Sequence, residues 1–184
     1  ESDILQSSDG LMNDRFGFSV ALNDDNLFIG ASGDEERTGS VYSFILENSV
    51  WNEVSILSAG DGSPGAQFGF SMDVAGDSLI IGANEENEKQ GSAYIFVRGE
   101  MGWDEATKLL ASDGENNDKF GTSVAISNEY ALVGAFGDDE NSGSVYVFEP
   151  GMEGWSEINK LILEDREPGD DYGIAVALDT EQSF

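Results

Sequence analysis

The chain has 184 residues, of which 39% are hydrophobic, and its 37 acidic side chains stand against only 8 basic ones, giving a formal net charge of -29. This length is enough for one ordinary domain with a hydrophobic core, and the negative charge disfavours nucleic acid and anionic membranes as partners. The sequence has no Cys and no His, which excludes disulfides, zinc sites of the Cys/His type, and Ser-His-Asp or Cys-His catalysis.

One sequence pattern recurs with a constant spacing. An aromatic-Gly pair begins at positions 16, 68, 120 and 172, so successive copies are 52 residues apart. A Gly-Ala pair, a Gly-Ser-x-Tyr segment and a tryptophan each occur three times with the same spacing. A period near fifty residues built from strands is typical of a propeller or a solenoid, in which each repeat packs against its copies.

The first two strands of a repeat are read most clearly in the third copy. Residues 120–126 (FGTSVAI) alternate large side chains with Gly, Ser and Ala, which is the period-two pattern of a strand with two different faces. The small face allows a neighbouring backbone to approach closely, as happens where sheets crowd around an axis. Residues 131–135 (ALVGA) are almost continuously apolar and predict a central strand that is covered on both faces.

The third and fourth strands complete the repeat. Residues 143–148 (GSVYVF) are rich in β-branched and aromatic side chains and follow a turn of Gly, Asp and Asn. Residues 155–161 (WSEINKL) mix Trp and Leu with charges and predict an outer edge strand. Polar loops separate the strands, and no amphipathic helical pattern of useful length is present. The predicted fold class is all-β, with blades of four antiparallel strands.

The order FGxSVA, LxxGA, GSVYVF and WxExxKL resembles the FG-GAP repeat, in its short bacterial-type form. Such repeats are related to those that build the seven-bladed propeller of integrin α subunits. The resemblance covers essentially all of residues 1–184, as a single propeller module with an incomplete fourth copy. It implies a four-stranded blade per repeat and an extracellular or cell-surface role in adhesion, recognition or scaffolding. A fold of this kind specifies function much less than it specifies structure.

Calcium is the one cofactor that the sequence suggests, and no cofactor is certain. Integrin-type repeats often carry a calcium loop between the first and second strands, but here residues 23–26, 75–78 and 127–130 are too short and offer too few oxygens for an ion that takes six to eight. Weaker candidates lie in the loops before the first strand, where oxygens are closely spaced. Asx turns and solvated acids are the alternative interpretation. The candidate ligands are Asp113, Glu115, Asn117, Asp118, Asp9, Asn13 and Asp14.

A second acidic set lies in the loops between the second and third strands. Every copy should direct this loop the same way, so the carboxylates are predicted to line one rim of the propeller. Such a rim would attract calcium or a basic partner, and a merely solvated rim is the alternative. The set comprises Asp34, Glu35, Glu36, Glu85, Glu86, Glu88, Asp138, Asp139 and Glu140.

The aromatic residues are interpreted as packing residues. Trp51, Trp103 and Trp155 are the only tryptophans, and their recurrence at one place in the repeat favours contacts between neighbouring blades over ligand stacking. The phenylalanines of the Phe-Gly pairs are likewise predicted to be in the core, with Gly supplying unusual dihedral angles or close approach.

The number of repeats leaves the assembly open. The chain holds three full repeats and about half of a fourth, whereas propellers close with four to eight blades. The segment is therefore expected to be part of a longer propeller, one half of a seven-bladed ring formed by a two-fold dimer, or an open stack of blades. Self-association that completes the ring is one of the predicted partner interactions.

The predicted function is binding and not catalysis. No carboxylate pair stands out from the repeated acidic loops, and no phosphate-binding or nucleophile motif is present, so no enzyme is expected. No apolar run is long enough for a membrane-spanning helix, so membrane insertion is not expected either. We predict an extracellular adhesion module that recognises a protein or glycan through rim loops. The alternative is a structural building block of an extracellular or cell-surface assembly.

Overall fold

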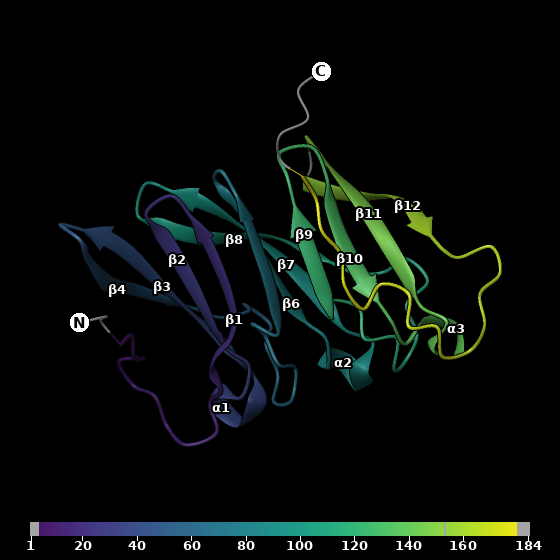
Figure 1. Cartoon of the computed structure of the whole chain (residues 1–184), viewed down its shortest axis with the longest axis horizontal. Coiled ribbons are helices and arrows are strands. Elements are labelled where there is room, and N and C mark those ends of the chain that lie inside the picture. The colour runs from purple at the N-terminus through teal and green to yellow at the C-terminus, as the bar shows by residue number, and fades with distance from the viewer. Residues whose placement is uncertain (1–3, 153, 180–184) are drawn as a thin grey trace.

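The computed structural model describes residues 4–152 and 154–179 and contains three four-stranded antiparallel sheets, one for each full repeat (Figure 1). The predicted all-β class and the blade-like sheets are confirmed. The strands are β1 (Phe16–Asn23), β2 (Asn26–Ala31), β3 (Ser40–Glu47) and β4 (Val50–Leu57); β5 (Ser71–Ala75), β6 (Ser78–Ala83), β7 (Ser92–Gly99) and β8 (Gly102–Leu109); and β9 (Ser123–Ile126), β10 (Ala131–Ala135), β11 (Ser144–Gly151) and β12 (Gly154–Leu161).

Each sheet pairs its strands in chain order, which makes the first and fourth strands its edges. The first strands β1, β5 and β9 lie beside one another, so the sheets converge along their inner edges. The fourth strands β4, β8 and β12 are the outer edges, as predicted from their mixture of aromatic and charged residues. This arrangement is that of consecutive propeller blades.

A short turn connects the second strand to the third in every repeat. The three turns are α1 (Asp34–Arg37), α2 (Glu86–Lys89) and α3 (Asp138–Asn141). Each contains three successive residues with positive φ angles, so these elements are compact turns and not regular helices. All three lie along the lower edge of the molecule in Figure 1. The opposite ends of the sheets carry the hairpins that join first to second and third to fourth strands.

The structure corrects the predicted position of the first strand. In the second and third repeats the strand begins at Ser71 and Ser123, three residues after the aromatic of the Phe-Gly pair. Gly69 and Gly121 adopt positive φ angles, which interrupt an extended chain. The aromatic residue contacts the previous blade instead, because Phe120 forms a parallel bridge with Gly91.

The incomplete fourth copy also differs from the prediction. Its Tyr172 forms the same bridge, with Gly143, but residues 173–179 are irregular and contain no strand. A first strand is stable only when it pairs with a second strand, and none follows within the described residues. Residues 180–184, where that second strand would begin, lie outside the described residues.

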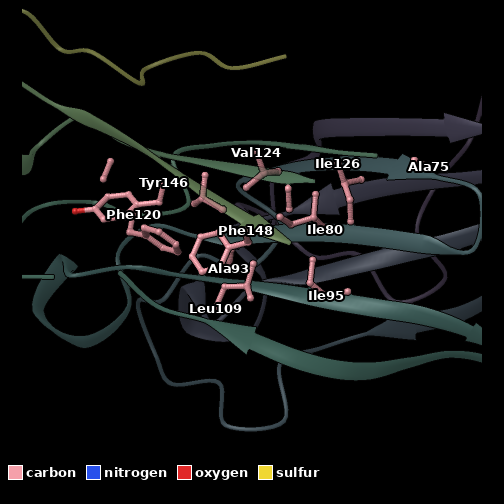
Figure 2. Packing of buried hydrophobic residues seen from close by; sticks show 13 residues of the cluster. Ala75, Ile80, Ala93, Ile95, Leu109, Phe120, Val124, Ile126, Tyr146 and Phe148 are labelled. Atoms are coloured by element: carbon pink, nitrogen blue, oxygen red, sulfur yellow. The ribbon is translucent and has the colours of Figure 1, made fainter. Parts of the chain in front are cut away.

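The hydrophobic core lies between successive sheets. In Figure 2, Ile80, Ile95 and Leu109 from the second sheet lie close to Phe120, which precedes β9, and to apolar side chains of the third sheet such as Val124. Phe120 is fully buried, as predicted for the Phe-Gly aromatics. A similar cluster joins the first and second sheets. Burying apolar area at about 25 cal/mol per Å² makes such interfaces the main source of stability.

Trp103 and Trp155 pack at the same interfaces. Trp103 of the second sheet meets Phe28 of the first with ring centroids 5.0 Å apart and planes at 90°. Trp155 packs against the cluster between the second and third sheets. The predicted contact between neighbouring blades is confirmed for Trp103, and Trp155 packs against a cluster that two sheets share. Trp51 differs, because it packs against a cluster formed by residues of its own sheet.

A glycine in each second strand permits close approach of the next blade. A Cβ atom on Gly30 would lie 2.4 Å from the carbonyl oxygen of Gly69, a separation that no packed side chain adopts. The same carbonyl accepts a hydrogen bond of 2.6 Å from the Ser19 hydroxyl on β1. Equivalent hydrogen bonds join Ser71 to Gly121 and Ser123 to Gly173. The predicted small face of the first strand thus acts together with the Gly-Ala pair of the second.

Candidate functional site

The candidate site is the rim formed by α1, α2, α3 and the loops that precede the first strands. It is organised by one buried tyrosine in each third strand, Tyr42, Tyr94 or Tyr146. The Tyr94 hydroxyl donates to the Asp61 carboxylate at 2.8 Å, and Tyr146 donates to Asp113 at the same distance. These bonds tie the loop before a blade to the third strand of that blade.

A lysine of the fourth strand completes the arrangement in the third repeat. Lys160 Nζ lies 2.8 Å from Asp113 and 2.6 Å from Asp138. Burial alone would lower the pKa of Lys160, but its hydrogen bonds with these carboxylates outweigh burial and raise the pKa above its ordinary value. Burial would likewise raise the pKa of Asp113, but the bonds from Lys160 and Tyr146 hold it below the usual range.

The second repeat has the same ion bridge. Lys108 Nζ lies 2.6 Å from Asp61 and 3.0 Å from Glu86. The Lys108 hydrogen bond is the main reason why the pKa of Asp61 is lowered. Burial and the bond to Glu86 raise the pKa of Tyr94, which therefore stays a neutral hydrogen-bond donor. One ammonium group thus bridges two carboxylates at the rim and balances one of their two negative charges.

The first repeat lacks this lysine, because Ile56 occupies the corresponding place on β4 and pairs with Tyr42. The Tyr42 hydroxyl lies 2.7 Å from Asp9 and 3.4 Å from Asp34, and within the described residues neither carboxylate has an ion pair. Burial first, and then these carboxylates, raise the pKa of Tyr42. The rim therefore differs in charge from one repeat to the next.

Several of the predicted calcium ligands take part in hydrogen bonds that hold the loops in place. Asp113 is held by Tyr146 and Lys160, as described above. Asp118 is buried and accepts from the Glu115 backbone N–H at 2.6 Å. Burial raises the pKa of Asp118, and the carboxylate of Asp138 adds to the effect. Asn117 has a positive φ of 75°, so it shapes this turn.

The first copy has the same loop geometry. Asp9 accepts from Tyr42, Asp14 accepts from the Leu11 backbone N–H, and Asn13 has a positive φ of 81°. Across residues 4–152 and 154–179 no group of three or more acidic side chains is gathered closely enough to hold a metal ion. Calcium binding at either loop stays a prediction.

The predicted acidic rim residues fall into two sets. Those that begin a turn face inward: Asp34 approaches Tyr42, Glu86 bonds Tyr94, and Asp138 is buried against Lys160. The others reach solvent, although some have partners at the surface. Glu85 pairs with Arg37, Asp139 pairs with Arg166, and Glu88 accepts from Asn116. Glu85 is only half-exposed, and the outward set is Glu35, Glu36, Glu88, Asp139 and Glu140.

In the third repeat the rim is hollowed into an acidic cavity of about 470 Å³ lined by Asp118, Asp138, Glu140 and neighbouring residues. Lys160 is its one basic lining residue among those described. The sequence interpretation missed both rim lysines and the role of the tyrosines. Their signal was present, because Lys108 and Lys160, like Tyr94 and Tyr146, are 52 residues apart.

Comparison with known proteins identifies a repeat family and a curated relative. A family model described as the FG-GAP repeat matches residues 1–44, 51–96 and 103–148. A curated relative, integrin alpha-2 of Mus musculus, is 26% identical over 169 residues, which cover 78% of this chain and 14% of the relative. The chain therefore spans a small part of that relative's length. Among the described residues, no helix has the length and apolarity needed to cross a membrane.

Proposed function

Because the chain belongs to the FG-GAP repeat family, we propose that it is a non-enzymatic recognition module of the adhesion type, which acts outside the cell or at its surface and binds a partner protein through its acidic rim. The likeness to integrin alpha-2 supports this class of function and this location. The predicted ligand was a protein or a glycan, and the rim favours a protein that presents lysine and arginine side chains.

The observation that carries this proposal is the repeated arrangement of outward carboxylates. Three consecutive turns present acidic side chains along one edge, at the regular spacing of the blades. The inward acids of the same turns are engaged in holding the structure together. Of the outward acids, Asp139 pairs with Arg166 and Glu88 accepts from Asn116, so Glu35, Glu36 and Glu140 are the ones most available to a partner. Complementary charge steers association and fixes orientation, and its effect weakens as salt is added.

A fluorescent octalysine peptide provides the test. The double substitutions Glu35→Lys with Glu36→Lys, and Asp139→Lys with Glu140→Lys, should each weaken binding about tenfold, which corresponds to roughly 1.4 kcal/mol. The matched control is Asp24→Lys with Asp25→Lys, which makes the same charge change at the opposite end of the first sheet. Equal losses in control and rim variants would show that net charge alone attracts the peptide. Octalysine binding should also weaken as NaCl is added, whereas binding of a neutral glycan would not depend on salt.

A structural building block is the second candidate, because the first sheet leaves an apolar face open. Val20 is 57% and Leu22 59% exposed on β1, where the second and third sheets bury the corresponding faces against a neighbouring blade. We propose a second copy of the chain as its occupant, as in the predicted ring of seven blades. Sedimentation should then show a dimer that Val20→Lys with Leu22→Lys abolishes. A monomer up to about 0.1 mM would eliminate this candidate.

A further inference from the structure

A cleft lies between the first and second sheets, at the ends of the blades opposite the acidic rim. Its volume is about 280 Å³, just below the range of about 300 to 1,000 Å³ that is typical of ligand pockets. One wall is formed by β2, β3 and β4, and the other by the hairpin that joins β7 to β8. This site is separate from the rim, and it is not used by the proposed function.

The cleft exists because two small residues stand where the next repeat has larger ones. Ser43 and Ser55 are paired across β3 and β4, in register with Phe28, on the face turned to the second sheet. One repeat later these two positions are occupied by Ile95, which is fully buried, and Thr107. The second interface is therefore filled at this point, and the first is open.

Two polar groups in the cleft have no partner in the protein. The Ser43 side chain is only 2% exposed, yet its hydroxyl makes no hydrogen bond within residues 4–152 and 154–179. The Arg98 guanidinium, on the opposite wall, makes no ion pair or side-chain hydrogen bond with any described residue. Among the described residues the buried unpartnered side-chain atoms are Ser32 Oγ and Asn84 Oδ1, so the Ser43 hydroxyl is accessible from the cleft and is available to bond a molecule that enters it.

The remaining lining residues indicate what kind of ligand fits. Trp103 is half-buried in the wall, and its perpendicular contact with Phe28 at 5.0 Å fixes the ring in place. Ile45 and Val54 add apolar surface, while Ser55 and Asn26 add further hydrogen-bonding groups. A fixed aromatic ring with several neutral donors and acceptors suits a ring that is apolar on its faces and hydroxylated on its rim.

We propose that this cleft binds one pyranose ring of a neutral saccharide. Trp103 provides the apolar wall, Ser43, Ser55 and Asn26 bind hydroxyl groups, and Arg98 donates to a ring or hydroxyl oxygen. An acidic sugar is disfavoured because Arg98 also borders an adjoining cavity of about 290 Å³ lined by Asp24, Asp25 and Asp77. The net charge of -29 adds a general repulsion of anions.

The tryptophan indole N–H signals in a nitrogen-proton correlation spectrum provide the readout. Trp103 is one of only three tryptophans, and Trp103→Phe assigns its signal. Cellobiose, lactose and maltose are titrated separately to about 20 mM, which covers weak binding. At least one of them should shift the Trp103 signal to saturation and leave those of Trp51 and Trp155 unchanged. No shift with any of the three would overturn the proposal.

Ser43→Ile tests the location. It introduces the residue found one repeat later, so the fold should tolerate it, and filling the cleft should weaken binding at least tenfold. Ser156→Ile makes the same chemical change at an exposed position on β12 and should leave binding unchanged. Undiminished binding by Ser43→Ile would contradict the proposed site.

Two further measurements keep the proposal falsifiable if Ser43→Ile does not fold. Arg98→Gln alters an exposed side chain and should weaken saccharide binding at least threefold. Glucuronate should bind more weakly than the best neutral sugar, and tighter binding of glucuronate would overturn the neutral class. Binding of octalysine at the rim is measured independently, so either proposal can fail without the other.

Discussion

At the residue scale, one position of the repeat decides the electrostatics of the rim. Lys108 and Lys160 each bridge two carboxylates and also lie 5.1 Å from the centre of a tyrosine ring. Ile56 provides neither contact, so the carboxylates of Asp9 and Asp34 in the first repeat are not neutralised. Nearby like charges destabilise a fold when no cation lies between them.

We expect Ile56→Lys to stabilise the protein. The new ammonium group can reach Asp9 and Asp34 as its counterparts reach theirs, which should raise the free energy of unfolding by about 1 kcal/mol, since partly exposed ion pairs contribute little more. Chemical denaturation measures this change. Ile56→Gln is the control for side-chain length without charge, and equal gains from Lys and Gln would exclude the ion bridge as the cause.

The bridged aspartates should make stability depend on acidity. The pKa values of Asp61 and Asp113 are lowered in the folded chain, mainly by the Lys108 hydrogen bond in the first case, and against the effect of burial in the second. Their contribution is therefore complete above the unfolded pKa of about 3.9 and is lost as the pH falls through the folded values. Relief of general repulsion acts in the opposite direction.

A difference measurement separates the two effects. The free energy of unfolding of the native chain should exceed that of Asp113→Asn near neutral pH, and the gap should close as the pH falls below about 4. Denaturation curves for both chains between pH 7 and pH 3 provide the data. A gap that stays constant over this range would contradict the lowered pKa of Asp113.

At the scale of elements, the second strand determines how closely blades pack. Its glycine faces the backbone of the next repeat, so Gly82 meets the Gly121 carbonyl and Gly134 meets the Gly173 carbonyl. The sequence predicted this close approach from small residues of the first strand, and the structure adds the glycine of the second. The pair of Ser71 and Gly121 shows how both strands contribute, because its hydrogen bond forms only at this short separation.

Gly82→Ala should be strongly destabilising for this reason. Its Cβ would lie 2.1 Å from the Gly121 carbonyl oxygen, so the second and third sheets would have to separate. A loss of about 3 kcal/mol in the free energy of unfolding is expected for such overpacking. Gly151→Ala is the control, since its Cβ would have ordinary contact at 3.4 Å. A loss below about 1 kcal/mol would show that the interface adapts.

At the scale of the whole molecule, the net charge and the exposed faces of the sheets have the largest influence on stability. A charge of -29 on 184 residues makes the folded state self-repelling. The three blades bury apolar surface only between neighbours, so stability is expected to spread along the array from one interface to the next. A ligand bound at the rim, at the cleft or at the open face would raise the stability of the folded state further.

Salt should therefore stabilise the protein. Raising NaCl from about 0.01 M to 0.5 M shortens the screening length from roughly 30 Å to below 10 Å and should raise the melting temperature by several degrees. Differential scanning fluorimetry provides the measurement. The same ionic strength from sodium sulfate and from NaCl helps to separate screening from ion-specific effects. A falling melting temperature would mean that the ion bridges of the rim outweigh the general repulsion.

The sequence by itself determined the repeat, the all-β class, the four strands of each blade and the packing role of Trp103 and Trp155. Each of these follows from local sequence patterns or from the 52-residue spacing of the repeats, and neither depends on the three-dimensional arrangement of the strands. The ion bridge of Lys160 with Asp113 and the cleft at Ser43 were decided only by the tertiary structure. Both depend on which side chains of neighbouring strands and blades face one another. A repeat pattern emphasises what the copies share, so a position at which one copy differs, such as Ser43, is easily overlooked.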